Sequence, residues 1–439
     1  MSRKILLVTG WYRPESVGGT ETYVGWLAAD LKALGYDARI AAPSTDEREM
    51  DYEHEGIPVH RYPVSRNPSR DELSGKSEPA FFDVFRRWAA ADRPDLVHFH
   101  SYGRGCGLPH AEFFRGARVP VVVTAHTPLL NCARGTMTRW GTVACDGLMR
   151  PALCGACYLQ SRGVPRPLAW AAALAPGLAG TLPDGRLRTA LTIRRAMERR
   201  RAAVLRFLDI AGSVIVVCRW LEEAFRLNGV PDEKLVLLRQ GLPARQTPPR
   251  VPSGGPVRIG YLGRLHPSKG VDVLVRSFVR LPSRTEAELH LYGGAQDEAS
   301  RAYEKRLRAL AGADPRIRFH GPVPQSETAQ ALRDLDALAV PSLWMETGPL
   351  VALESFSVGT PVIGSGLGSL PEIVTDGVNG LIVPPGDVEA WTRTLERVSA
   401  DRGLLRRLSE GRPEIKTSAE VARKTAALYE KAFQRREAA

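Results

Sequence analysis

Two glutamates in the C-terminal half of the chain stand at the start of a predicted helix. Glu346 and Glu354 are eight positions apart in the stretch PSLWMETGPLVALE. The helical pattern covers Leu350 to Val358, with Pro349 in its first turn and Gly359 as its stop signal. A helix N-terminus attracts anions, and carboxylates accept hydrogen bonds from hydroxyl groups. The stretch therefore predicts a site for a ligand that carries both phosphate and hydroxyl groups. A capped surface helix with two solvated carboxylates is the plainer alternative.

Two basic residues follow a predicted strand earlier in the same half. Arg264 and Lys269 come after the apolar run Val257–Leu262 and before a helical pattern, Val271–Phe278. Ligands of α/β proteins bind at the carboxyl ends of parallel strands. Two fixed cations at that edge are suited to a diphosphate, although each one alone could be an ordinary surface cation.

The C-terminal half of the chain resembles the retaining family 4 glycosyltransferases, which have the GT-B fold. The ordered set of motifs is far more specific than any of its members. The resemblance implies an α/β protein with two Rossmann-like, doubly wound parallel-sheet domains that face each other across a cleft. Between about Val257 and Asp387 the motifs occur in family order: GRL at 263–265 with KG at 269–270, PS at 341–342 with Glu346 and Glu354, GTPVI at 359–363, PEIV at 371–374 and NGLIV at 379–383.

The resemblance also implies a role for each of the four side chains. Arg264 and Lys269 would bind the diphosphate of a nucleotide-sugar, Glu346 the sugar hydroxyls and Glu354 the ribose. The donor would be a UDP- or GDP-sugar, and a hexose-type sugar would move to a glycan or lipid-linked acceptor in the synthesis of cell-surface polysaccharide or glycoconjugate. The alternative is another GT-B enzyme, such as a nucleotide-sugar epimerase or a phosphorylase.

Proline at position 349 affects which backbone groups can contact the phosphates. Pro349 has no N–H, so the amides of Gly348 and Leu350 are the expected contacts. Fixed cations and a helix N-terminus stabilise a departing diphosphate, so the predicted chemistry requires no cofactor and no metal ion. Family members retain the anomeric configuration, which implies front-face attack with the donor phosphate taking the acceptor proton. The acidic stretch Asp334–Asp336 matches the triplet of metal-dependent transferases only superficially and is interpreted as structural.

The N-terminal half resembles the same family more loosely. Gly18 and Gly19 lie between the first predicted strand and a helix, Thr22–Leu34, where glycine lets backbone N–H groups approach a ligand. The resemblance places both in an acceptor-side loop that faces the donor phosphates, whereas a tight turn is the plainer alternative. His126 follows the run Pro120–Ala125. In similar enzymes a histidine here lines the reaction centre, so His126 is a candidate for contact with the sugar or the acceptor.

Several other functions are disfavoured. The fingerprint G-x-G-x-x-G is absent, and no acidic residue ends the second predicted strand, which argues against a nicotinamide oxidoreductase. The net charge of +12, from 60 Lys and Arg against 48 Asp and Glu, favours anionic partners. No helix-turn-helix, finger or RNP pattern supports nucleic acid as that partner. His98 and His100 share one face of a predicted strand and are interpreted as structural.

No segment of the sequence is typical of a membrane span. The most apolar stretch, Leu168–Leu182, has 15 residues and contains a proline and a glycine, whereas a spanning helix needs about 20. The run Ile5–Val8 is too short for a signal peptide and fits a first strand. We therefore expect a cytoplasmic protein. The basic segment Ile193–Leu205 could make it peripheral on an anionic inner membrane face, or could pack on its own sheet with a solvated basic face.

Alternating strand-like and helix-like runs predict a parallel sheet in each half of the chain. We expect an N-terminal acceptor-binding domain at 1–242 with a cysteine-rich insert at 130–160, a linker at 243–256, a C-terminal donor-binding domain at 257–415, and a helix at 416–439 that could cross back to the first domain. The expected strands are Ile5–Thr9, Ala38–Ala41, Leu96–Phe99, Val119–Thr124, Val214–Val217 and Leu235–Leu238, then Arg258–Leu262, Glu288–Tyr292, Ile317–His320, Ala337–Val340, Val362–Gly364 and Leu381–Val383.

Four of the six cysteines lie in one window with the spacing C-x12-C-x8-C-x2-C: Cys132, Cys145, Cys154 and Cys157. The closing C-x-x-C resembles one arm of a tetrahedral zinc site, and a cytosolic location disfavours disulfides. Three interpretations are open at this point. The thiolates bind a structural zinc that braces the insert beside His126, or they are ordinary reduced thiols, or they have a redox or iron–sulfur role.

Overall fold

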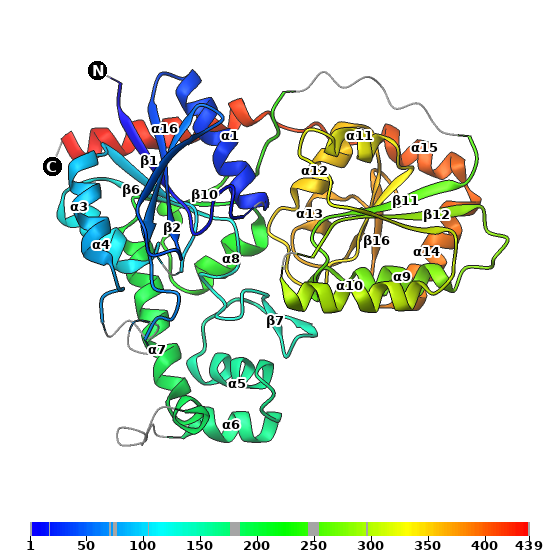
Figure 1. The fold of residues 1–439 in the computed structure, drawn as a ribbon, viewed down its shortest axis with the longest axis horizontal. Helices are drawn as coiled ribbons and strands as arrows, with labels where there is room; N and C mark the ends of the chain where they lie inside the picture. The colour runs from blue at the N-terminus through cyan, green and yellow to red at the C-terminus, as the bar shows by residue number, and fades with distance from the viewer. Residues whose placement is uncertain are drawn as a thin grey trace. The chain divides into compact units, whose positions relative to one another are not determined.

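A computed structural model of the protein describes residues 2–437 except 17, 70, 71, 73–76, 104, 176–184, 245–253 and 296. The chain forms two compact units (Figure 1): residues 1–240 together with 418–439, and residues 241–417. Most of the predicted linker, residues 245–253 of 243–256, lies outside the described part, as do residues 176–182 of the apolar stretch noted above.

The first unit is built on an eight-stranded sheet in the order β10-β9-β6-β5-β1-β2-β4-β3. Neighbouring strands run parallel except β3 and β4, which form an antiparallel hairpin at one edge. From β1 the chain continues to β2 on one side and later to β5 on the other, so the sheet is doubly wound about β1. The strands are β1 (Lys4–Val8), β2 (Asp37–Ser44), β3 (Met50–His54), β4 (Ile57–Pro63), β5 (Leu96–Phe99), β6 (Val121–Ala125), β9 (Ser213–Val216) and β10 (Leu235–Leu237).

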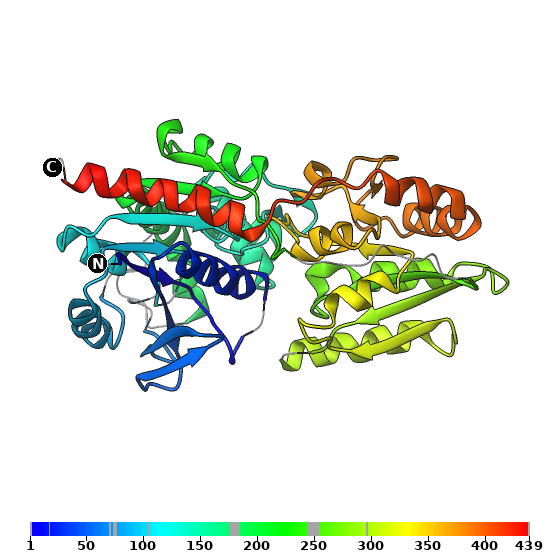
Figure 2. The same ribbon diagram turned by 90° about the horizontal axis from the view of Figure 1, so that it is seen from above.

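Successive side chains of β1 point to opposite faces of the sheet, and a layer of helices packs on each face. Leu6 and Val8 pack with α3 (Phe82–Asp92), α4 (Leu108–Gly116), α7 (Arg186–Ile210) and α8 (Arg219–Leu227). Ile5 and Leu7 pack with α1 (Gly19–Ala33) and α16 (Ser418–Glu437). Figure 2 shows α16 alongside α1, so the last helix of the chain completes the core of the first unit.

An insert extends from this sheet between β6 and β9. It consists of the two-stranded ribbon β7 (Thr138–Arg139) and β8 (Val143–Ala144), then α5 (Pro151–Ser161), α6 (Arg166–Leu174) and the beginning of α7 (Figure 1). Among the described helices, none has both the length and the apolarity that a membrane crossing requires.

The second unit contains a six-stranded parallel sheet in the order β13-β12-β11-β14-β15-β16. The chain builds outward from β11 to β13 and then returns to place β14 on the other side of β11, so the switch point lies between β11 and β14. The strands are β11 (Val257–Leu262), β12 (Ala287–Tyr292), β13 (Ile317–Gly321), β14 (Ala337–Val340), β15 (Val362–Ser365) and β16 (Gly380–Val383).

Helices cover both faces of the second sheet. One core cluster joins the sheet to α9 (Val271–Val279), α10 (Glu298–Ala311), α14 (Val388–Ala400) and α15 (Arg402–Glu410). The other joins it to α11 (Thr328–Arg333), α12 (Leu350–Ser357) and α13 (Leu370–Ile373). Two doubly wound parallel sheets confirm the predicted fold class.

All twelve expected strands are present, with ends shifted by up to three residues. The hairpin of β3 and β4 was missed, although Glu55 and Gly56 both have a positive φ at its turn, as a tight hairpin requires. The expected helix after Glu346 needs one correction. Pro349 is the N-cap of α12 rather than a residue of its first turn, and Gly359, with φ of 83°, follows the helix end as expected.

Candidate active site

Lys269 and Glu346 meet at the switch point of the second sheet. Lys269 belongs to the short helix η3 (Pro267–Lys269) that follows β11, and Glu346 lies in the loop after β14. These strands are neighbours in the sheet, so their loops emerge side by side at its carboxyl edge. The Lys269 Nζ atom donates a hydrogen bond to Glu346 Oε1 over 2.7 Å. Two of the predicted site residues are thus in direct contact.

Close backbone contacts fix these two loops to each other. The Leu343 N–H donates to the Ser268 carbonyl over 2.8 Å. Gly270 has φ of 66°, and a Cβ atom there would lie 2.0 Å from the Pro341 carbonyl oxygen. Only glycine can occupy this position, because a side chain would be strained and would also push the loops apart.

A third loop, after β15, holds the backbone of Glu346. The Ser369 N–H donates to the Glu346 carbonyl over 2.8 Å. Gly368 has φ of 65°, and a Cβ atom there would lie 2.4 Å from the Glu346 nitrogen. The position of Glu346 is therefore set by loops from three adjacent strands, β11, β14 and β15.

Glu346 is a buried carboxylate, with 4% of its surface exposed. Burial by itself raises the pKa of Glu346, but the charge of Lys269 and hydrogen bonds from Lys269 and Ser342 outweigh it, so the pKa is lowered. The Ser342 Oγ atom donates to Glu346 Oε1 over 2.6 Å. Lys269 Nζ also lies 4.9 Å from the centre of the Trp344 ring. Glu346 is therefore ionised at neutral pH and can accept hydrogen bonds from hydroxyl groups.

Arg264 supplies a second cation on the loop after β11. Its side chain is exposed, while its carbonyl accepts a hydrogen bond of 2.6 Å from the Tyr261 hydroxyl. The pKa of His266 is lowered by partial burial and then by the charge of Arg264, is opposed by the charge of Asp297, and is lowered further by the charge of Lys269. Both cations therefore lie near the same histidine of one loop.

The helix α12 begins at Leu350, four residues after Glu346. Pro349, as N-cap, offers no side-chain acceptor, and no side-chain cap is made to the first turn. Glu354 lies in the second turn, half-buried, and accepts a hydrogen bond of 2.8 Å from Gln325 Nε2. Gln325 orients Glu354 from the loop after β13, and nothing in the sequence indicates that contact.

The acidic stretch before β14 is structural, as the sequence indicated. The buried Asp336 carboxylate accepts a hydrogen bond of 2.8 Å from the Arg258 N–H. Arg258 and Asp336 stand at the amino ends of β11 and β14, whereas Lys269 and Glu346 follow the carboxyl ends. The carboxylate of Asp336 therefore ties the opposite edge of the sheet together.

In the first unit, Gly18 and Gly19 begin α1. Gly18 is the N-cap with an extended φ of −145°, so glycine is not required by a left-handed backbone. Instead, a Cβ atom on Gly18 would lie 2.7 Å from Glu21 Oε2. The Ser16 hydroxyl donates to Glu21 Oε1 over 2.6 Å. A carboxylate therefore already lies at this helix N-terminus, which the sequence analysis missed.

His126 follows β6 and is 5% exposed. Its Nε2 atom lies 3.0 Å from His100 Nδ1, and its ring centre lies 4.7 Å from that of Tyr23 on α1. Burial lowers the pKa of His126 to about 3, so the imidazole is neutral at physiological pH. His98 bonds Tyr429 of α16 over 2.6 Å and Thr124 over 2.7 Å, which supports its structural interpretation.

The predicted site residues thus form two groups, one in each unit. Lys269 and Glu346, with Arg264, Glu354 and the start of α12, belong to the second unit. His126, Gly18 and Gly19 belong to the first, as do the four clustered cysteines.

Comparison with known proteins identifies two matching families. The model described as "Glycosyl transferase 4-like domain" matches residues 18–241, just over half of the chain. The model described as "Glycosyl transferases group 1" matches residues 246–414. A D-inositol 3-phosphate glycosyltransferase from Xylanimonas cellulosilytica is 34% identical over 223 residues, which cover 46% of this chain and 52% of that protein. The chain spans between about a third and a half of the length of the curated relatives it matches.

Solved structures resemble the chain over nearly its full length. Sucrose-phosphate synthase from Thermosynechococcus elongatus has a TM-score of 0.67 at 21% identity and covers 98% of this chain and 100% of its own. HepE from Anabaena, in complex with UDP and glucose, has a TM-score of 0.64 at 15% identity and covers 98% and 99%. These likenesses confirm the predicted GT-B fold.

Proposed function

Because the chain belongs to the glycosyl transferase 4-like family of GT-B glycosyltransferases, we propose that it moves a hexose-type sugar from a UDP- or GDP-sugar to a glycan or lipid-linked acceptor. The observation that carries this proposal is the contact of Lys269 with Glu346 at the switch point. There a cation for a diphosphate lies beside a buried carboxylate for sugar hydroxyls. Further support comes from the solved HepE structure, which contains UDP and glucose.

The charges of the second unit suit the departure of a diphosphate. Breaking the sugar–phosphate bond leaves an oxocarbenium-like sugar and a more negative diphosphate. Arg264 and Lys269 would stabilise the diphosphate, together with the amides of Gly348 and Leu350 at the start of α12. These groups already supply positive charge where the reaction needs it, so no catalytic metal ion is part of the proposal.

The proposed reaction retains the anomeric configuration through front-face attack. The bond between the sugar C1 and the phosphate oxygen breaks, and its electron pair goes to the phosphate. The acceptor hydroxyl attacks C1 from the same face and passes its proton to that phosphate oxygen. Glu346 is held as a hydrogen-bond acceptor by Lys269 and Ser342, which suits sugar binding better than nucleophilic attack. His126, which is neutral, would contact the sugar or the acceptor, and Glu354 the ribose.

Product analysis with a panel of donors tests this function. We expect one UDP- or GDP-sugar to raise the melting temperature of the protein and to release UDP or GDP when an acceptor is added. The anomeric configuration of the product, read by NMR, should match that of the donor. Release of a free epimerised sugar, or phosphorolysis of a glycan, would instead identify another GT-B enzyme. Inversion of the anomer would contradict the front-face mechanism.

A lipid-linked acceptor would bring the enzyme to a membrane surface, in keeping with a role in cell-surface glycoconjugate synthesis. Of the two alternatives for the segment Ile193–Leu205, packing within the protein fits its apolar residues, because Ile193 and Val204 of α7 are buried. Among its described residues, the insert exposes Val143 on β8, at 56%, and three leucines on α6 and α7. Leu168 is 62%, Leu174 is 59% and Leu187 is 64% exposed. Exposed arginines of α7 could add attraction to anionic lipid.

Flotation with lipid vesicles tests this attachment. We expect the protein to float with vesicles that contain anionic phosphatidylglycerol and to remain unbound with neutral phosphatidylcholine. The double variant L168E/L174E should lose binding, because it replaces apolar contacts by negative charge. The matched control is Leu227→Glu on α8, where the leucine is 53% exposed outside the insert. Equal flotation of all three proteins would contradict the proposal that the insert contacts the membrane.

A further inference from the structure

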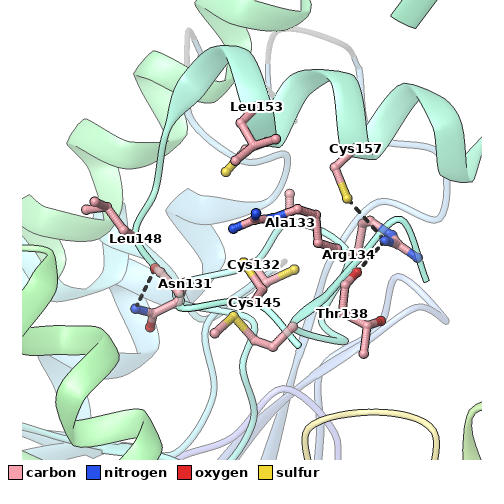
Figure 3. A pocket seen from close by; sticks show the side chains of 13 residues that line it. Asn131, Cys132, Ala133, Arg134, Thr138, Cys145, Leu148, Leu153 and Cys157 are labelled. Atoms are coloured by element: carbon pink, nitrogen blue, oxygen red, sulfur yellow. Dashed lines mark hydrogen bonds between the residues drawn. The ribbon is translucent and has the colours of Figure 1, made fainter. Parts of the chain in front are cut away.

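The four clustered cysteines line a single cavity inside the insert, with a volume of about 40 Å³. A water molecule needs about 10–15 Å³ on this measure, so the cavity can hold an ion. Figure 3 shows Cys132 and Cys145 from the loop and Cys157 from α5 around this space. Cys154 also lines it. Residues from two separate segments are therefore gathered around one small cavity.

The local backbone explains how the sulfurs come together. Cys145 follows the ribbon of β7 and β8, and its N–H donates to the Met137 carbonyl over 2.8 Å. This closes the loop that begins at Cys132. Cys154 and Cys157 are three residues apart on α5 and so lie on one helix face. The loop and the helix each contribute two thiols.

Hydrogen-bond donors point at three of the four sulfurs, those of Cys145, Cys154 and Cys157. Cys157 Sγ accepts from Arg134 Nη1 over 3.2 Å and from the Trp140 N–H over 3.4 Å. Figure 3 shows Arg134 bonded to both Cys157 and Thr138. Cys145 receives a backbone hydrogen bond from Gly147. Donors in these positions orient the sulfurs, as groups around metal-bound cysteines do.

The fully buried core of the insert is small, although partly buried side chains such as Trp140 and Trp170 pack against it. Its own apolar cluster has five buried members, and three of these are alanines: Ala156, Leu159, Ala169, Ala173 and Ile193. Small cores of this kind usually require a disulfide or a metal ion. The cysteine loop is also strained, since Met137 and Trp140 have φ of 52° and 59°. Such conformations cost about 1–3 kcal/mol each and persist only where surrounding structure enforces them.

We propose that Cys132, Cys145, Cys154 and Cys157 bind one structural zinc ion as thiolates. A zinc ion with four thiolates is an anion, and Arg134 and Arg139, which line the same cavity, offset that charge. Within the described residues, no three Cys, His, Asp or Glu side chains are yet close enough together to hold an ion. Binding therefore requires the half-buried cysteine side chains to rotate inward. Four protein ligands close the coordination sphere, so the ion braces the insert and takes no part in catalysis.

Elemental analysis of the full-length protein, purified without chelator, tests the site directly. We expect about one zinc per chain, released when the thiols are titrated with a mercurial reagent. Cobalt substitution should produce the absorption bands of tetrahedral cobalt with thiolate ligands. Cys157→Ala should lower the zinc content and the melting temperature. Cys106→Ala, which removes a buried cysteine outside the cluster, should leave the zinc content unchanged.

Several outcomes would overturn the proposal. They are wild-type protein with reduced thiols and no stoichiometric metal, iron with the visible absorption of an iron–sulfur cluster, and disulfides within the cluster in non-reducing peptide maps. Because the metal content of the wild-type protein needs no variant, the test holds even if Cys157→Ala fails to fold. Donor binding by the second unit is a separate measurement, so failure here leaves the proposed function intact.

Discussion

Replacing Lys269 with alanine is expected to lower kcat at least about tenfold, which corresponds to about 1.4 kcal/mol of transition-state stabilisation. Glu346→Gln should cause a loss of the same order. Lys269 would stabilise the departing diphosphate, and Glu346 the sugar hydroxyls, and the two side chains are 2.7 Å apart. Turnover of the donor identified by the panel, measured at saturating donor and acceptor, checks both values.

Stability measurements separate this role from that of a merely structural ion pair. Lys269→Ala leaves Glu346 buried without its cation, at a cost of about 2 kcal/mol. This lies below the ~3–5 kcal/mol of a fully buried pair because the Lys269 side chain is 21% exposed. The double variant K269A/E346Q removes both charges, so it should recover stability and remain inactive. If the double variant recovered turnover, the ion pair would have only a structural role, and the proposed catalytic role of Lys269 and Glu346 would be contradicted. Lys305→Ala on the exposed face of α10 is the matched control and should retain full activity.

The largest combined loss of stability and activity is expected for Gly270→Ala. A Cβ atom at this position would lie 2.0 Å from the Pro341 carbonyl oxygen and 3.1 Å from Leu343. The Pro341 backbone cannot rotate away as a flexible side chain can. The loop that carries Lys269 must therefore move away from the loop that carries Glu346. We expect turnover of Gly270→Ala to fall by more than about tenfold, which is the smallest loss expected for Lys269→Ala. Denaturant unfolding and steady-state kinetics measure the two effects.

Gly377→Ala provides a matched control for the backbone strain. Gly377 has φ of 73°, close to the 66° of Gly270, but no atom lies within 4 Å of a Cβ atom there. It should show only the cost of a left-handed alanine, about 1–2 kcal/mol, with unchanged turnover. If Gly270→Ala destabilises the protein no more than Gly377→Ala does and remains active, the close contact of the two loops is not needed for function.

The second unit could be predicted well because its signals are local and occur in a fixed order. Apolar runs bounded by turn residues predicted the strands of this unit to within one residue at each end. The motifs placed Lys269 and Glu346 after separate strands, and the chain order of an open α/β sheet makes those strands neighbours. The contact of the two side chains follows from topology rather than from either motif alone.

Contacts between side chains far apart in sequence could not be predicted in the same way. The hydrogen bond of Gln325 to Glu354 joins the loop after β13 to the second turn of α12, and no local pattern marks either partner. Likewise, Tyr429 of α16 reaches His98 across 331 residues. The burial of Ile193 and Val204 was also ambiguous, because an apolar stripe among arginines fits lipid and protein equally well.

The roles of His126, Gly18 and Gly19 rest on resemblance and stay predictions. The structure adds that His126 is held between His100 and Tyr23 as a neutral ring. It also adds that Glu21 lies against Gly18. Repulsion from this carboxylate would weaken any phosphate contact at the start of α1, unless the Glu21 side chain turns away when the donor binds.

A crystal structure with the bound nucleoside diphosphate tests the central claim most directly. The account predicts the diphosphate within hydrogen-bonding distance of Arg264, Lys269 and the amides of Gly348 and Leu350, with the ribose hydroxyls on Glu354. A diphosphate bound away from the carboxyl ends of β11 and β14, or held by a metal ion with Lys269 still turned only to Glu346, would contradict it.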